Sequence, residues 1–202
     1  MRVVVNGRPA DQLEPSIERQ LVSGSPHERV QGAVMGADEA VAATGRSLRI
    51  LYSVLCGLAA VIMLGALIGV GSYEPRDLTF LIPFVLVLAG GLALLMRFTY
   101  RRNTGKVRQR AAEQLSRMPP VGTMVLAEAD GLGVGQDRYP WSALAASAID
   151  VTATNFNDAP LNLIERLELD GAGPRPLVLD AVLIGNGRAV VDEIWRRLRE
   201  RA

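Results

Sequence analysis

The side chains that most often act as nucleophiles or bases are scarce in this sequence of 202 residues. It holds one histidine, His27, and one cysteine, Cys56. A serine nucleophile needs a base within hydrogen-bond reach, and neither Ser142 nor Ser147 has a histidine near it in the sequence. We therefore expect a protein that is not an enzyme and has no catalytic residues.

Metal ions and cofactors also lack a recognisable sequence signature. A lone cysteine forms neither an intramolecular disulfide nor a cysteine-based metal site, and a lone histidine excludes multi-histidine sites. The glycine-rich segment 131–135 has no following helix and no Lys-Ser or Lys-Thr, so it fits neither a P-loop nor a dinucleotide fingerprint. We expect no metal and no cofactor.

A run of cations between positions 97 and 110 is the feature with the clearest functional meaning. No acidic residue interrupts this run before Glu113. Each cation attracts anionic lipid with about 1 kcal/mol near a membrane surface, but the same charges also set the topology of a neighbouring helix, and both interpretations stay open. The candidate anionic-lipid contacts are Arg97, Arg101, Arg102, Lys106, Arg108 and Arg110.

Nucleic acid is not an expected partner. The net charge of the whole chain is only +1. The basic run also lacks interleaved aromatic side chains for base stacking, apart from Phe98 and Tyr100.

Two long apolar blocks must position this basic run. Ile50–Val70 and Leu78–Met96 contain no charged residue, and they raise the mean hydropathy of the chain to +0.20. As helices rising about 1.5 Å per residue they would each extend roughly 30 Å, which matches the hydrocarbon core of a bilayer. The blocks predict a two-helix transmembrane hairpin.

The distribution of charge predicts how this hairpin is oriented. The connection Gly71–Asp77 carries one cation, Arg76, whereas Arg46 and Arg49 precede the first block and the basic run follows the second. The positive-inside rule then places both termini in the cytoplasm. The expected location is the bacterial cytoplasmic (inner) membrane, with a multi-pass topology.

Small residues mark a candidate helix-packing face in the hairpin. A four-residue spacing of small residues lets helix backbones approach closely. Contact within the hairpin, homodimerisation and docking on another subunit all remain open. The candidate residues are Gly65, Gly69, Ala89, Gly90 and Ala93.

Residues 1–49 form the expected N-terminal cytosolic segment. Arg2–Val5 predicts a strand, and Asn6-Gly7 is the strongest short turn signal in the chain. Pro15 and Pro26 are interpreted as breakers. Asp38 can cap a helix that continues into the first apolar block.

The C-terminal part divides into a basic helical stalk, 99–119, and a small cytosolic domain, 120–202. Asp130-Gly131 predicts a hairpin turn, and Leu161–Leu169 alternates as a half-buried strand. In the last helix, Val190, Val191, Ile194, Trp195 and Leu198 share an apolar face, while Arg188, Arg196, Arg197 and Arg199 lie on the other. The predicted fold class is an α+β membrane protein, in which the hairpin (50–98) carries an antiparallel sheet capped by this amphipathic helix.

The order of these elements resembles a known family. The motif Asp130-Gly-Leu-Gly-Val, the segment Tyr139–Leu144 and a final helix that bears a tryptophan resemble YcxB-like bacterial membrane proteins. The resemblance covers the two apolar blocks and residues 120–202, and it implies a cytosolic domain similar to pleckstrin-homology folds. The alanine-rich stretch 143–148 departs from the family, which carries a hydrophobic strand entry there.

These patterns favour a non-enzymatic inner-membrane protein that presents its cytosolic domain for protein or lipid binding. The alternative is an accessory subunit of a larger membrane complex, such as a respiratory or photosynthetic assembly. The expected partners are membrane lipids and either a membrane protein or a second copy of the chain.

Overall fold

The computed structural model describes the backbone of residues 1–22, 29–70, 75–156 and 159–200. It describes no side chains at positions 47, 51, 58–60, 62–70, 75–86, 88, 89, 92, 155, 156 and 159–161. The chain divides into two units, which are described separately. An α+β unit contains residues 1–40 and 109–202, and a helical unit contains residues 41–108.

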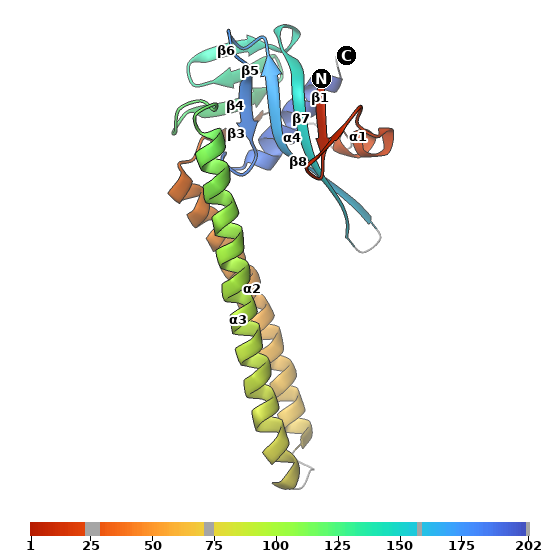
Figure 1. Cartoon of the computed structure of the whole chain (residues 1–202), viewed down its shortest axis with the longest axis vertical. Coiled ribbons are helices and arrows are strands. Elements are labelled where there is room, and N and C mark those ends of the chain that lie inside the picture. The colour runs from red at the N-terminus through yellow and green to blue at the C-terminus, as the bar shows by residue number, and fades with distance from the viewer. Residues whose placement is uncertain (23–28, 71–74, 157–158, 201–202) are drawn as a thin grey trace. The chain divides into compact units, whose positions relative to one another are not determined.

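Two β-sheets and the C-terminal helix build the α+β unit (Figure 1). The five-stranded sheet has the order β2-β1-β7-β8-β9, and the four-stranded sheet has the order β3-β4-β5-β6. The strands of the first sheet are β1 (Arg2–Val5), β2 (Arg8–Ala10), β7 (Ala145–Phe156), β8 (Ala159–Asp170) and β9 (Leu177–Asp180). Those of the second are β3 (Arg29–Ala33), β4 (Met124–Glu128), β5 (Gly131–Val134) and β6 (Asp137–Pro140).

The N-terminal segment is an integral part of this unit. Strand β1 pairs in parallel with β7, with Val3 opposite Ile149, and β3 pairs in antiparallel fashion with β4. Both β1 and β3 therefore find partners more than 90 residues away in the sequence. The sequence-based boundary at residue 49 differs from the observed one because isolated short strands gain little stability until they join a larger sheet.

Local turn chemistry explains two of the hairpins. Asn6 and Gly7 both have positive φ, of 52° and 75°, as a type I′ turn requires, and the predicted strand and turn at the N-terminus are confirmed. Between β5 and β6, Gly135 has φ of 63° at the first central position, which suits a type II′ turn. The predicted pairing around Asp130-Gly131 is also confirmed, because β4 pairs with β5.

Two elements of the N-terminal segment differ from the prediction. Pro15 begins helix α1 (Pro15–Val22) instead of breaking one, since proline lacks only an N–H that the first turn leaves unpaired in any case. Strand β3 has no recognisable alternation in its sequence, although Val30 and Gly32 are buried.

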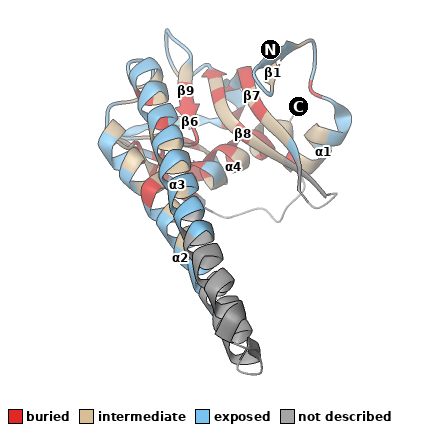
Figure 2. Ribbon diagram, turned by 60° about the horizontal axis from the view of Figure 1, so that its bottom comes forward, coloured by how far each residue is buried: buried red, intermediate tan, exposed pale blue. Residues whose placement is uncertain are grey.

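Helix α4 (Gly187–Arg199) confirms the predicted C-terminal amphipathic helix. The side chains of Val190, Val191, Ile194 and Trp195 are fully buried. They pack on strands of both sheets, namely β7, β8 and β9 of the first and β3 and β4 of the second, and α4 also contacts α1 (Figure 2). The hydrophobic core therefore lies around this one helix.

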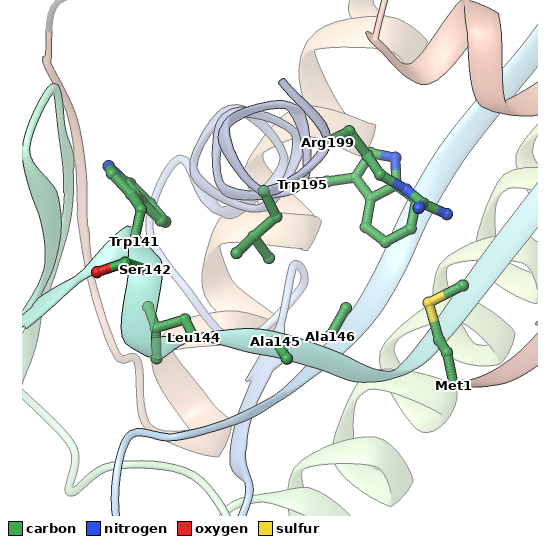
Figure 3. A pocket seen from close by; sticks show the side chains of 9 residues that line it. Met1, Trp141, Ser142, Leu144, Ala145, Ala146, Trp195 and Arg199 are labelled. Carbon is green, nitrogen blue, oxygen red and sulfur yellow. The ribbon is translucent and has the colours of Figure 1, made fainter. Parts of the chain in front are cut away.

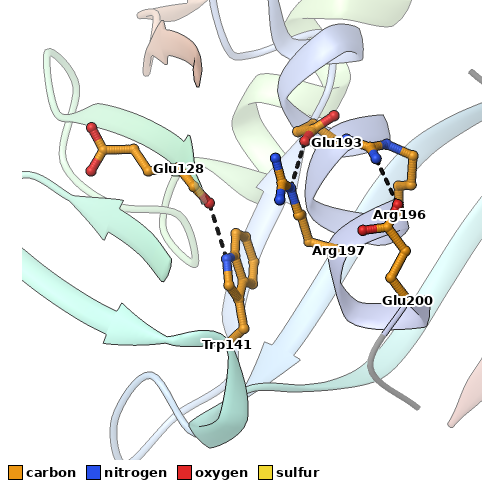
Figure 4. Close-up of polar contacts among 6 residues, drawn as sticks. All are labelled: Glu128, Trp141, Glu193, Arg196, Arg197 and Glu200. Carbon is orange, nitrogen blue, oxygen red and sulfur yellow. Dashed lines mark hydrogen bonds and ion pairs between the residues drawn. The ribbon is translucent and has the colours of Figure 1, made fainter. Parts of the chain in front are cut away.

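The polar face of α4 is more buried than the helical periodicity predicts. Arg196 was expected in solvent, but its side chain is only 6% exposed and pairs with Glu193, which is 3% exposed (Figure 4). Arg197 and Glu200 complete the network, with distances of 2.8 Å from Arg197 Nε to Glu193 Oε1 and 2.7 Å from Arg196 Nη1 to Glu200 Oε1. A mostly buried guanidinium requires such partners to remain charged.

Helices α2 (Ala37–Val70) and α3 (Pro75–Gln114) form the hairpin of the helical unit. The first turn of α2 and the end of α3 from residue 109 onward belong to the α+β unit. They contain 34 and 40 residues and run side by side in both views (Figures 1 and 2). The expected continuation of the Asp38 helix into the first apolar block is confirmed. The predicted basic stalk is the end of α3, which is continuous with the second block.

The predicted membrane hairpin is contradicted. Among the residues that the structure describes, no helix combines the length and the apolar character that crossing a membrane requires. Each apolar block is only part of its helix, since α2 begins at Ala37 and α3 continues to Gln114. The expected α+β membrane fold, the inner-membrane location and the multi-pass topology are therefore wrong.

A second difference from the prediction is that one of the two sheets contains a parallel pair of strands, whereas an antiparallel sheet was expected.

Gly32 provides a test of how β3 closes the α+β unit. The free edge of β3 lies against residues 183–185, where the Gly185 N–H donates to the Ala33 carbonyl oxygen at 2.8 Å. A Cβ atom at Gly32 would overlap the carbonyl oxygen of Gly185. We expect Gly32→Ala to lower the free energy of unfolding by about 2 kcal/mol or more, because the backbones would have to separate.

Gly36→Ala is the matched control, since a Cβ there would lie 3.8 Å from its nearest neighbour, Val121. Its cost should stay below about 1 kcal/mol. Equal losses for the two variants in urea denaturation would contradict the proposed close approach at Gly32.

Candidate interaction surfaces

The helical unit exposes many large apolar side chains. Eight of them are between 43% and 73% exposed. Single exposed apolar residues are common on protein surfaces, whereas this many on one pair of helices indicate a site of interaction. The eight residues are Ile50, Val54, Leu55, Val61, Val87, Leu94, Leu95 and Phe98.

On each helix, most of these side chains form one stripe. At about 100° per residue, Ile50, Val54 and Val61 lie within about 40° of one another around α2, and Val87, Leu94 and Phe98 do so around α3. Leu55 and Leu95 lie to one side of these stripes. We name the eight side chains together the apolar surface of the hairpin.

The described contact between the two helices lies at one end of the hairpin. A Cβ atom at Gly45 would lie 3.1 Å from the ring of Tyr100, so the missing side chain of Gly45 allows the tyrosine to pack against the backbone of α2. Gly45 was not among the predicted packing residues. The sequence signal for this contact is a glycine on one helix and a tyrosine on the other, both near the same end of the hairpin.

The predicted small-residue face has a mixed outcome. The burial of Gly65, Gly69 and Ala89 lies outside what the structure describes. Gly90 and Ala93 are exposed, and no atom lies within 4 Å of a Cβ built at Gly90. Within the described residues these two positions make no close helix contact, so a packing role for them would need a partner.

Most of the basic run is accessible. Arg97, Arg101, Arg102, Lys106 and Arg108 are exposed on α3. Arg110 differs because it belongs to the α+β unit and binds Glu165, with Nη1 2.5 Å from Oε2. Burial alone would lower the pKa of Arg110, but the hydrogen bond and charge of Glu165 raise it.

A β-bulge presents Glu165 to this arginine. Asp150 pairs with Arg166 and Val151 with Ile164, so Glu165 is the extra residue of β8. The bulge shifts the phase of the strand, and Ile164 is buried where alternation predicts Leu163. The pattern of leucines therefore predicted the strand and the burial of Leu167 and Leu169, but not the burial of Ile164 on the other side of the bulge.

Two further carboxylates lie near Arg110. Burial raises the pKa of Asp180, whose Oδ1 accepts a hydrogen bond from the Val182 N–H at 2.9 Å, and Arg110 partly opposes this rise. Burial likewise raises the pKa of Asp150, against the charges of Arg166 and Arg110. Within the described ranges, no three carboxylate, histidine or cysteine side chains are arranged to hold a metal ion.

A cleft of about 380 Å³ lies between α4 and the start of β7 (Figure 3). Both tryptophans of the chain line it. Trp141 is fixed by a hydrogen bond from Nε1 to the Glu128 carbonyl oxygen at 3.0 Å (Figure 4), and the guanidinium of Arg199 lies 4.6 Å from the Trp195 ring centre. Trp141 is only 2% exposed and Trp195 is fully buried, so the two rings act mainly in packing.

The histidine, the cysteine and the two serines considered in the sequence do not form a catalytic group among the described residues. His27 lies outside the described residues. Cys56 is a free, exposed thiol on α2. Ser147 donates to the carbonyl oxygen of Glu168 at 3.3 Å, and Ser142 is exposed beside Trp141.

Comparison of the chain with protein-family models, curated proteins and solved structures gives no match. The resemblance to YcxB-like proteins therefore remains a prediction from the motif and the order of elements.

The bulge and the end of α3 should be energetically coupled. We expect Glu165→Ala and Arg110→Ala each to lower the free energy of unfolding by about 1 kcal/mol, and the double variant to show a coupling of about 0.5–1.5 kcal/mol in a double-mutant cycle. The control pair is Arg29 and Glu128, which is 3.3 Å apart and more exposed. Its coupling should stay below about 0.5 kcal/mol, and a larger value there than for Arg110 and Glu165 would contradict the assignment.

Asp192 should make stability depend on pH. Burial raises its pKa to about 6, with Arg188 opposing the shift, and its Oδ1 is buried without a hydrogen-bond partner among the described residues. The native state therefore binds more protons than the unfolded one between about pH 4 and pH 6, and stability falls as the pH rises through this range.

We expect Asp192→Asn to raise the free energy of unfolding by about 1–2 kcal/mol at neutral pH and to change it little near pH 4. Denaturation curves collected across this range would measure the effect. Asp11→Asn, at an exposed position, is the control and should leave the profile unchanged. A wild-type pH profile for Asp192→Asn would exclude this role.

Proposed function

We propose that the chain is a non-enzymatic interaction protein, an accessory subunit whose hairpin packs among helices of a larger protein assembly. Its α+β unit is the part presented for further binding. The observation that carries this proposal is the apolar surface of the hairpin, which includes four exposed side chains on α2 and four on α3.

The energetics of this surface support association. Complete burial of one such side chain contributes about 1.5–3 kcal/mol, so covering the exposed part of all eight would contribute on the order of 10 kcal/mol. The loss of translational and rotational freedom on association costs about 4–15 kcal/mol. The apolar surface is thus sufficient to offset much of this cost when a partner covers it.

The two surfaces of the chain differ in a way that fits such a subunit. The α+β unit has a continuous core and buries its large apolar residues, with Val121 and Met124 among the exceptions. The hairpin leaves comparable side chains in solvent. The side chains described in the hairpin are therefore the ones for which we propose a protein partner.

Removal of the apolar surface should release the partners. The experiment compares the wild type, carrying a C-terminal tag, with the triple variant Val54→Gln, Leu94→Gln and Phe98→Gln. Mass spectrometry after gentle purification should recover a stoichiometric set of co-eluting subunits with the wild type. The triple variant should lose this set, because each substitution places an uncompensated amide in an apolar contact.

The matched control carries Val121→Gln and Met124→Gln, which are exposed apolar residues of the α+β unit, and it should keep the set. Retention by the triple variant together with loss in the control would place binding on the α+β unit instead. Recovery of a wild-type monomer without co-eluting subunits would contradict the accessory role.

A further inference from the structure

A groove of about 410 Å³ opens at one end of the α+β unit. Three segments that are distant in the sequence form its walls: 117–123 after helix α3, the turn 134–137 between β5 and β6, and 172–177 before β9. All three belong to the same unit. The volume lies in the range of sites that bind small molecules, about 300–1,000 Å³.

Two unpaired cations line this groove. Arg117 and Arg175 are exposed, and neither guanidinium group forms a hydrogen bond or ion pair with a residue that the structure describes. This sets them apart from Arg29, Arg110 and Arg196, each of which binds a carboxylate in the same unit. Their guanidinium groups therefore keep their full capacity to bind an anion.

One carboxylate also lines the groove, so its net charge is smaller than that of the two arginines. Asp137 lies on the β5–β6 turn and interacts with the Tyr139 hydroxyl; burial, followed by the charge of Asp137, raises the pKa of that tyrosine. With two guanidinium groups and one carboxylate the groove carries a net charge of +1. Thr123 and Gln136 add a hydroxyl and an amide that can donate to oxygen.

The remaining lining residues hold these donors in place. Pro119, Pro120 and Pro176 have restricted backbones, and Gly135 occupies a tight turn with φ of 63°. The Gly135 N–H donates to the Met124 carbonyl oxygen at 2.8 Å, and the Thr123 N–H donates to the Pro120 carbonyl oxygen at 3.0 Å. Such loops lose little conformational freedom when a ligand binds.

We propose that this groove binds a phosphate monoester group. Guanidinium groups bind phosphate oxygens through paired, charge-assisted hydrogen bonds, and the three terminal oxygens of a phosphate monoester can accept from two arginines at once. The apolar walls formed by the prolines and Leu177 can accommodate the organic part of such an ester. The proposal names what the α+β unit binds and does not depend on what covers the hairpin.

The first test measures binding of inorganic phosphate to the full chain by calorimetry at constant ionic strength. Arg117→Gln combined with Arg175→Gln should weaken this binding by about tenfold or more. The control combines Arg8→Gln with Arg19→Gln, which removes the same charge from exposed positions outside the groove, and its affinity should stay within about twofold of wild type.

A second arm distinguishes a soluble ester from a lipid headgroup. Vesicles of phosphatidylcholine with and without phosphatidic acid present the same phosphate monoester on a surface. Binding of inorganic phosphate at the groove supports a soluble ligand, whereas arginine-dependent binding that requires phosphatidic acid supports a headgroup.

Two results would overturn the proposal. One is that neither phosphate nor phosphatidic acid binds the wild type, and the other is that the groove and control variants lose binding equally. The triple hairpin variant should bind phosphate like the wild type, so failure of the groove proposal and failure of the accessory role give different results.

Discussion

The burial of the apolar face of α4 is the constraint on which the α+β unit depends. This helix contacts strands of both sheets and helix α1. Four of its apolar side chains are inaccessible to solvent, namely Val190, Val191, Ile194 and Trp195. Neither sheet could bury its inner face without the helix. Because β1 and β3 come from the first 33 residues, the same packing also ties the two ends of the chain into one unit.

A buried helix imposes conditions on its polar residues. Arg196 and Glu193 are both less than 10% exposed, and each is acceptable there only because the other is charged and in contact with it. Among the described residues, Asp192 Oδ1 has no hydrogen-bond partner, and burial raises the pKa of Asp192 although the charge of Arg188 opposes the shift. The same helix thus shows both ways in which a protein interior accommodates an ionisable group.

The hairpin exposes its apolar side chains, whereas the α+β unit buries them, and the proposed role of the chain rests on this contrast. Its apolar side chains are numerous, but two helices alone cannot cover one another on all sides. The α+β unit instead has a closed core and leaves a small charged groove open. Apolar exposure in one unit and unpaired arginines in the other correspond to two kinds of contact, one with protein and one with an anion.

The sequence by itself determined the elements whose signals are local. Asn6-Gly7, the hairpin around Asp130-Gly131 and the apolar face of α4 follow from turn chemistry or helical periodicity, which act within a few residues. The long helices follow from the length of the charge-free apolar blocks. The apolar blocks were also correctly placed on helices, although their interpretation as membrane spans was wrong.

Only the tertiary structure decided which residues meet. The parallel pairing of β1 with β7, the bulge that turns Glu165 toward Arg110, and the burial of Arg196 depend on partners far away in the sequence or on the other sheet. The groove with Arg117 and Arg175 joins three loops for the same reason. Periodicity reports which face of an element is apolar, but long-range packing decides which charges on the other face are buried, paired or left free.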